Sequence, residues 1–109
     1  MYDMNAREMQ ESPLTQGADE RIAWSFDGSS WGTVPFTNLT VTVYDISDER
    51  SATDVTSTVA EGDASVTDAG IITTKRIVNL TVGNDYRVEI QFTDADNNVY
   101  EPFFRLKCR

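Results

Sequence analysis

The fold of this chain is decided by one stretch, Leu80-Thr81-Val82-Gly83-Asn84-Asp85-Tyr86-Arg87-Val88-Glu89-Ile90-Gln91-Phe92-Thr93. Its second half alternates strictly, because polar residues separate the apolar Tyr86, Val88, Ile90 and Phe92. A period of two residues predicts a β-strand with one buried and one solvated face. The turn formers Gly83-Asn84-Asp85 mark where this strand begins. This is the clearest strand signal in the sequence.

Similar but shorter signals recur on both sides of this strand. We expect strands near residues 22–26, 39–46, 55–59, 77–80 and 99–106, with the weakest alternation in 55–59. Asp68-Ala69-Gly70 predicts a tight hairpin, and residues 94–98 predict a hairpin loop before the last strand. Pro102 inside that strand indicates an edge or a bulge. Short strands separated by regular turn signals, with no convincing helix, predict an all-β, two-sheet sandwich.

The bulk composition limits the classes of partner. A chain of 109 residues with 39% hydrophobic and 25% charged residues is one ordinary globular domain. Its net charge is −9, and such a surface repels phosphate, so we expect no nucleic-acid partner. An acidic module is better suited to docking on a basic protein surface.

Histidine is absent and Cys108 is the single cysteine. The commonest general base and the commonest metal ligand are therefore both missing, which excludes Ser-His-Asp, Cys-His and zinc chemistry. We expect no enzyme activity, no cofactor and no metal site. Carboxylates are numerous enough for a glycosidase pair, but nothing indicates a buried one, and a solvated acidic face is the simpler interpretation. Cys108 is interpreted as a tail thiol without a role, ahead of an intermolecular bridge.

Residues 1–18 differ from the rest of the chain, because they are polar, contain methionines and show no periodicity. We expect one β domain over residues 19–109 and an extended N-terminal arm over residues 1–18; a frayed terminus is the alternative. Apolar anchors on a partner would include Met4, Met9 and Leu14. The first sixteen residues contain no apolar run, so we expect neither a signal peptide nor a membrane span.

Two further features were candidates for ligand sites. Trp31 lies in a Gly/Ser-rich loop without an obvious core role, which makes it the candidate for stacking on a sugar. Residues 94–98 place oxygen ligands as a calcium loop would, but Val99 and Arg105 stand where an EF-hand needs Gly and Glu. A hairpin turn rich in turn formers explains that segment better.

The segment Leu80 to Val88, with Gly83 and Tyr86, resembles the tyrosine corner of fibronectin type III and immunoglobulin-like domains. In that motif the phenol packs inside, and its hydroxyl bonds the backbone across the corner. The resemblance implies an immunoglobulin/fibronectin III-like sandwich, with Trp24 as a core tryptophan of its second strand. An antibody-type domain has a cysteine where Val88 stands, so the disulfide-pinned subclass is excluded. The first strand is missing or hidden in the arm.

A narrower resemblance covers about residues 19–106. It is carried by the corner and by Asp19-Glu20-Arg21-Ile22-Ala23-Trp24-Ser25-Phe26, Val43-Tyr44-Asp45, Asp54-Val55-Thr56 and Ile72-Thr73-Thr74. These segments are similar to small sandwich proteins of tailed bacteriophages, which serve as fibre-to-tail adaptors, head–tail joint components or capsid decorations. The resemblance implies a non-enzymatic virion component, assembled in the host cytoplasm in multiple copies and bound to other virion proteins.

Within that class, an adaptor or joint protein at the tail is the first expectation, docking by its arm and its sandwich surface. A capsid decoration protein is the alternative. A free ligand-binding module for carbohydrate or a cell-surface protein is the competing class, and an enzyme comes third.

Overall fold

The computed structural model describes residues 6–9, 12–48 and 50–109, and these are mostly β. The described chain holds one short helix, α1 (Thr56–Val59). The strands are β1 (Ala6–Glu8), β2 (Leu14–Gln16), β3 (Ser25–Asp27), β4 (Thr37–Asp45), β5 (Thr53–Asp54), β6 (Ala60–Glu61), β7 (Ser65–Val66), β8 (Ile71–Thr73), β9 (Arg76–Ile77), β10 (Asp85–Thr93) and β11 (Val99–Cys108). No helix of these residues is long and apolar enough to cross a membrane.

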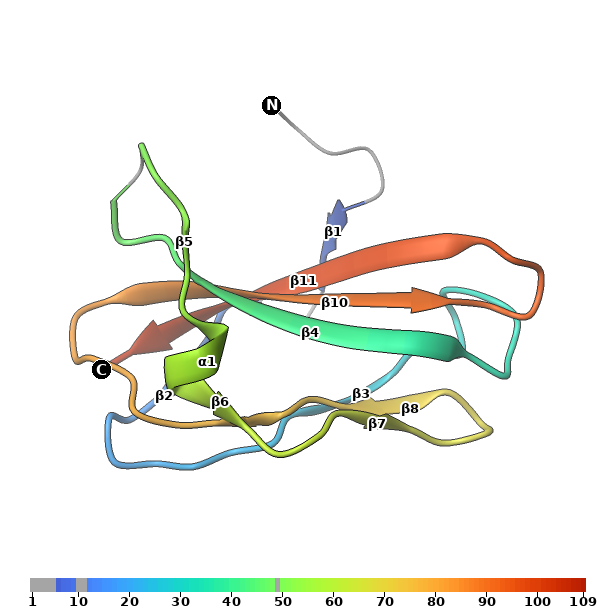
Figure 1. Ribbon diagram of the computed structural model, residues 1–109, viewed down its shortest axis with the longest axis horizontal. Coiled ribbons are helices and arrows are strands. Elements are labelled where there is room, and N and C mark those ends of the chain that lie inside the picture. Colours follow the sequence, from blue (N-terminus) through green and yellow to red (C-terminus); the bar gives the residue numbers. More distant parts are fainter. Residues whose placement is uncertain (1–5, 10–11, 49) are drawn as a thin grey trace.

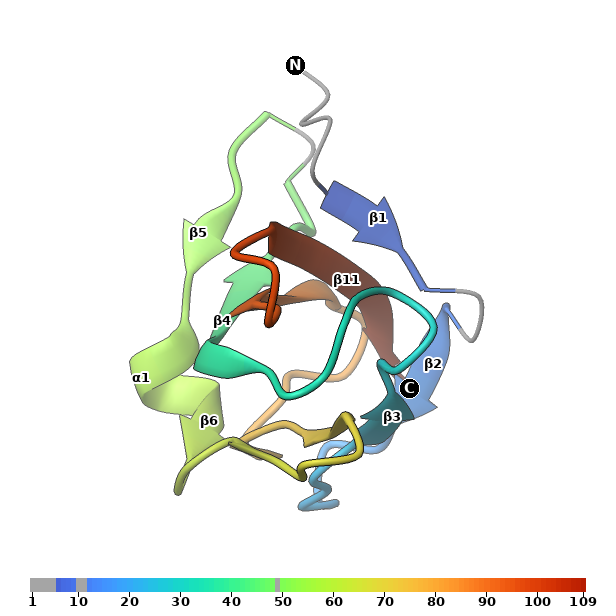
Figure 2. The same ribbon diagram turned by 90° about the vertical axis from the view of Figure 1, so that its right-hand side faces the viewer.

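The strands form two layers (Figure 1). One layer is a six-stranded sheet in the order β1-β11-β10-β4-β5, with β2 also paired to β11; we call it the larger sheet. The other layer contains the three-stranded sheet β3-β8-β7 and the two-stranded sheet β6-β9. Figure 2 shows these layers end-on, with β1 and β5 at opposite margins of the larger sheet. The core lies between the layers.

The strand that the sequence marks most clearly is the centre of the larger sheet. β10 pairs antiparallel with β4 on one side and with β11 on the other. The apolar residues of its alternation are all buried, as predicted: Tyr86, Val88, Ile90 and Phe92. A half-buried strand requires this pattern, because successive side chains point to opposite faces of the sheet. The predicted hairpin loop at residues 94–98 joins β10 to β11.

Tyr86 has the local geometry expected of a tyrosine corner. Its side chain is 3% exposed, and the backbone N–H of Thr81 donates a hydrogen bond of 2.9 Å to its hydroxyl oxygen. Gly83 between them has φ of +90°, a backbone conformation that suits glycine because it lacks a Cβ. The phenol therefore fixes the path of the chain into β10 from inside the core.

The described part of the predicted arm lies on the sheet. β1 pairs parallel with residues 101–103 of β11, and β2 pairs parallel with residues 106–108. Residues 6–9 and 12–16 are therefore part of the domain and do not form the separate arm that we expected. They contain strands at the edge of the larger sheet for which the sequence showed no alternation. Parallel pairing with a strand more than eighty residues away leaves no local periodicity, so no pattern in residues 1–18 predicted it.

Two local expectations also need correction. Residues 55–59 were expected to continue as a strand, but Thr56–Val59 form α1, with only Val59 buried. Pro102 was expected at an edge or a bulge, but β11 has β10 on one side and β1 on the other. Pro102 is opposite Arg7 in the parallel pairing with β1, so it lies inside the sheet.

Candidate interaction surface

The outer face of the larger sheet, which points away from β3, β7 and β8, carries a cluster of two aromatic rings around an arginine. Arg87 of β10 lies opposite Tyr44 of β4 and diagonally across from Phe103 of β11. Its guanidinium carbon is 5.3 Å from the centre of the Tyr44 ring and 5.7 Å from that of the Phe103 ring. Both distances are within the range of cation–π attraction. We call these three residues the Arg87 cluster.

The guanidinium of Arg87 also forms an ion pair within β10. Its Nη2 lies 2.7 Å from Oε2 of Glu89, two residues along β10 on the same face. The two side chains are 35% and 28% exposed, so the pair is only partly screened by water. The Nε atom of Arg87 is buried and has no hydrogen-bond partner in the described part of the chain. A buried donor without an acceptor costs free energy.

Tyr44 keeps its proton throughout the physiological pH range. Burial raises the pKa of its phenol, and the carboxylates of Glu89 and Asp54 raise it further. The hydroxyl of Tyr44 is therefore a neutral group that can both donate and accept a hydrogen bond.

Paired polar side chains surround the Arg87 cluster. Nε2 of Gln91 donates to Oε1 of Glu101 at 2.7 Å. Nε of Arg105 donates to Oε2 of Glu8 at 2.6 Å, which ties β11 to β1 and places a carboxylate beside Arg105. An aromatic and arginine centre inside a polar rim is the composition of protein–protein hot spots.

Comparison with protein-family models, with curated proteins and with solved structures gives no match. The function is therefore argued from the geometry of this face and from the sequence pattern. The sequence reasoning missed the Arg87 cluster, although a signal existed: Arg87 is an outward residue of the clearest alternation. Its two aromatic neighbours come from other strands, so only the register brings the three together.

Of the four residues predicted to bind a partner, the three that lie in the described part of the chain do not form one site. Met9 is buried in the core of this chain, where a partner cannot reach it, and Leu14 is partly buried against that core. Trp31 is half-buried, and its ring stacks on Phe92 with 6.0 Å between ring centres. This packing gives Trp31 a structural role that the sequence did not indicate. Met4 lies outside the described residues.

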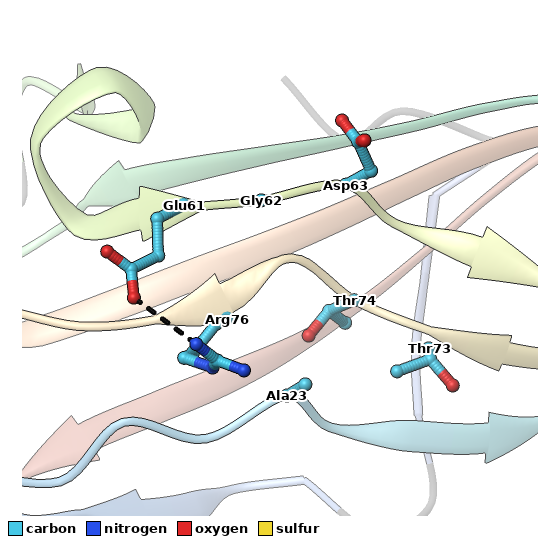
Figure 3. Close-up of a pocket in the computed structure, with 7 residues that line it drawn as sticks. All are labelled: Ala23, Glu61, Gly62, Asp63, Thr73, Thr74 and Arg76. Atoms are coloured by element: carbon cyan, nitrogen blue, oxygen red, sulfur yellow. Dashed lines mark ion pairs between the residues drawn. The ribbon is translucent and has the colours of Figure 1, made fainter.

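A shallow pocket lies on the second layer, lined by Ala23, Glu61, Gly62, Asp63, Thr73, Thr74 and Arg76 (Figure 3). Oε1 of Glu61 forms ion pairs with Nη1 of Arg76, at 3.7 Å, and with Nη1 of Arg21, at 3.3 Å. Both ion pairs lie on the exposed surface. The hydroxyls are already used: that of Thr73 bonds the hydroxyl of Ser25, and that of Thr74 donates to the carbonyl of Lys75. The side chains of Glu61, Thr73 and Thr74 in this pocket therefore already have partners within the chain.

Asp94, considered above as the first residue of a calcium-like loop, holds its own hairpin together. The side chain is buried and accepts backbone N–H groups from Thr33, Asp96 and Asn98, at 3.2, 3.0 and 2.8 Å. The loop before β4 is thereby fastened to the β10–β11 hairpin. Because these donors occupy the carboxylate oxygens, the geometry is that of a structural turn.

We expect Asp94→Asn to reduce the dependence of stability on acid pH. Burial raises the pKa of Asp94, but hydrogen bonds from Asn98, Thr33 and Asp96 outweigh it and hold the pKa below the usual value. A lowered folded pKa gives stability that is present above the unfolded pKa, about 3.9, and is lost as the pH falls through the folded value. Thermal unfolding should be measured between pH 6 and pH 2.5. The melting temperature of the variant should fall less over this range than that of the wild type. Asp68→Asn, in an exposed hairpin, is the control, and equal acid losses in wild type and Asp94→Asn would contradict the assignment.

Proposed function

We propose that this chain is a non-enzymatic structural component of a tailed-phage virion. In this proposal it is an immunoglobulin/fibronectin III-like sandwich that binds neighbouring virion proteins through the Arg87 cluster, most directly as an adaptor or joint at the tail. The assignment of this binding surface rests on one observation: Arg87 lies between two aromatic rings on the outer face of the larger sheet.

The fold part of the proposal is supported by four features. The Tyr86 hydroxyl receives a backbone N–H across the corner that leads into β10. The neighbours of β10 in the larger sheet, β4 and β11, are those expected of the third and seventh strands around a sixth. The parallel pairing of β2 with β11 supplies the first strand that the sequence pattern lacked. Trp24 packs on the core, with its ring 6.2 Å from that of Phe104.

The binding part is supported by chemistry and position. Tyrosine and arginine are enriched among the residues that dominate interface energies, and here Tyr44 and Arg87 lie opposite each other on the outer face of the larger sheet. The neutral phenol of Tyr44 would donate a hydrogen bond to a carbonyl or carboxylate of a partner. The virion context comes from the sequence resemblance.

We expect the double variant Tyr44→Thr/Phe103→Thr to be incorporated into particles at least about 30-fold less than wild type, which corresponds to about 2 kcal/mol. Threonine suits an exposed strand, so folding should be retained and is checked by thermal unfolding. Quantitative mass spectrometry of purified particles measures the incorporated fraction.

The matched control is Val99→Thr, which removes an exposed apolar side chain from β11 at a distance from the cluster. Normal incorporation of the double variant would show that this face is not the docking surface. Absence of the wild-type chain from particles would reject the virion role itself. The measured copy number separates the tail adaptor from the capsid decoration, because a ring at the tail holds far fewer copies than a capsid lattice.

A further inference from the structure

The edge of β4 is open over its first half. β5 pairs with β4 only at Tyr44 and Asp45, and α1 covers the next position. There the N–H of Val43 donates to Oγ1 of Thr56 and its carbonyl accepts the N–H of Val55, both at 2.9 Å. Backbone groups alternate in direction along a strand, so those of Val41, like those of Val43, point away from β10. They have no partner among residues 6–9, 12–48 and 50–109.

A groove of about 530 Å³ runs beside this open edge, lined by Leu39, Thr40, Val41, Asp63, Ala64 and Lys75. Leu39, Val41 and Ala64 give it an apolar wall and are buried or half-buried. Lys75 is half-buried in the groove, and no carboxylate of the described chain pairs with it. Asp63 is exposed at the rim. An unpaired strand edge beside an apolar groove is the arrangement used for binding by strand addition.

We propose that residues 1–5 of a second copy of this chain add to the β4 edge and occupy this groove. This inference rests on the proposed function, since it describes how copies join in one assembly. The contact is head-to-tail: the segment before β1 of one copy binds the groove of the next. Such contacts close into rings when the rotation between copies allows it.

The composition of residues 1–5 fits the groove. Met1 and Asp3 are two positions apart, so in an extended strand they point to the same side. With that side facing the groove, Met1 meets the apolar wall of Leu39, Val41 and Ala64. Asp3 then supplies the carboxylate that Lys75 lacks. The backbone of the added strand satisfies the open N–H and C=O groups of Val41.

The segment cannot reach the groove of its own copy. Residues 1–5 lead into β1, and an added strand beside β4 would lie four strand positions from β1 in the larger sheet. Four spacings of the sheet amount to about 19 Å, and five extended residues span about 17 Å even on a straight path. Occupation by a second copy is therefore the geometry that the chain length permits.

Charge exchange tests the proposal on the full chain. Asp3→Lys places a lysine against Lys75, and Lys75→Glu places a glutamate against Asp3. Each variant alone should weaken self-association at least about tenfold, measured by sedimentation velocity. An equimolar mixture of the two should associate again, because each segment then meets a groove of opposite charge. Lys107→Glu, at the only other lysine, is the matched control and should associate as wild type does.

Amide chemical shifts of Leu39 to Val41 should move with protein concentration in the wild type and not in either single variant. A wild type that stays monomeric at about 1 mM, or a mixture that stays as dissociated as its components, would overturn the proposal. Tyr44→Thr/Phe103→Thr should self-associate normally. If that variant self-associates but is not incorporated into particles, the result bears on the Arg87 cluster alone. If the mixture of charge variants fails to associate, the result bears on the β4 edge alone.

Discussion

Replacement of Phe92 by alanine is expected to lower the free energy of unfolding by about 3–5 kcal/mol. Phe92 is fully buried, and its ring contacts three others. The distances between ring centres are 4.3 Å to Phe36, 5.6 Å to Tyr100 and 6.0 Å to Trp31. Alanine would leave a cavity where the loop before β4 meets the hairpin of β10 and β11. For a domain of this size the melting temperature should fall by at least about 15 °C.

Phe92→Leu is the matched control, since it keeps most of the volume and removes only the aromatic ring. We expect it to cost less than about 1.5 kcal/mol. Chemical denaturation with urea measures both variants on the same scale. A loss below about 1 kcal/mol for Phe92→Ala would show that the aromatic cluster does not hold the two loops together.

The second large effect is expected at Gln16, a polar residue with no exposed surface. Its Nε2 donates to the carbonyls of Ile77 and Glu20, at 2.8 and 3.0 Å, and its Oε1 accepts Nε1–H of Trp24 at 3.1 Å. One side chain on β2 thus connects the larger sheet to the second layer. Gln16→Leu preserves the volume but leaves these groups unpaired. Because each buried unsatisfied polar group costs about 1–3 kcal/mol, we expect a loss of about 2–4 kcal/mol.

Thr15→Val serves as the control for Gln16→Leu, because Thr15 is the adjacent, exposed residue of β2. A valine there should change stability by less than about 0.5 kcal/mol. Tryptophan fluorescence during urea unfolding monitors both variants on the same scale. A neutral Gln16→Leu would mean that water or neighbouring groups replace its hydrogen bonds.

Residue patterns predicted the elements whose information is local. The alternation from Tyr86 to Phe92 predicted β10 and which of its residues are buried. It could do so because a half-buried strand imposes a two-residue period on the sequence itself. The turn formers around Gly83 and in residues 94–98 marked the ends of β10 for the same reason. The corner motif predicted a buried Tyr86 bonded to backbone, since Tyr86 is only five positions along the chain from Thr81.

Features that depend on contacts between distant segments were not predictable. Cys108 was interpreted as a tail thiol, but it is fully buried in the core, where burial raises the pKa of its thiol. Nothing in residues 55–59 distinguished one helical turn from a weak strand. The contact that holds the start of α1 comes from a distant strand, where the N–H of Val43 on β4 donates to Oγ1 of Thr56.

Local residue patterns were enough to predict a mostly β chain, its central strand with the inward face, and an acidic surface without histidine. The three-dimensional contacts were needed to learn that β1 and β2 run parallel to β11 and that Gln16 connects the layers. They were also needed to learn that Arg87 meets Tyr44 and Phe103 and that half of the β4 edge is open. The physical reason is the range of the interactions. Periodicity records which way each side chain points, whereas pairing partners are chosen by packing across the whole chain.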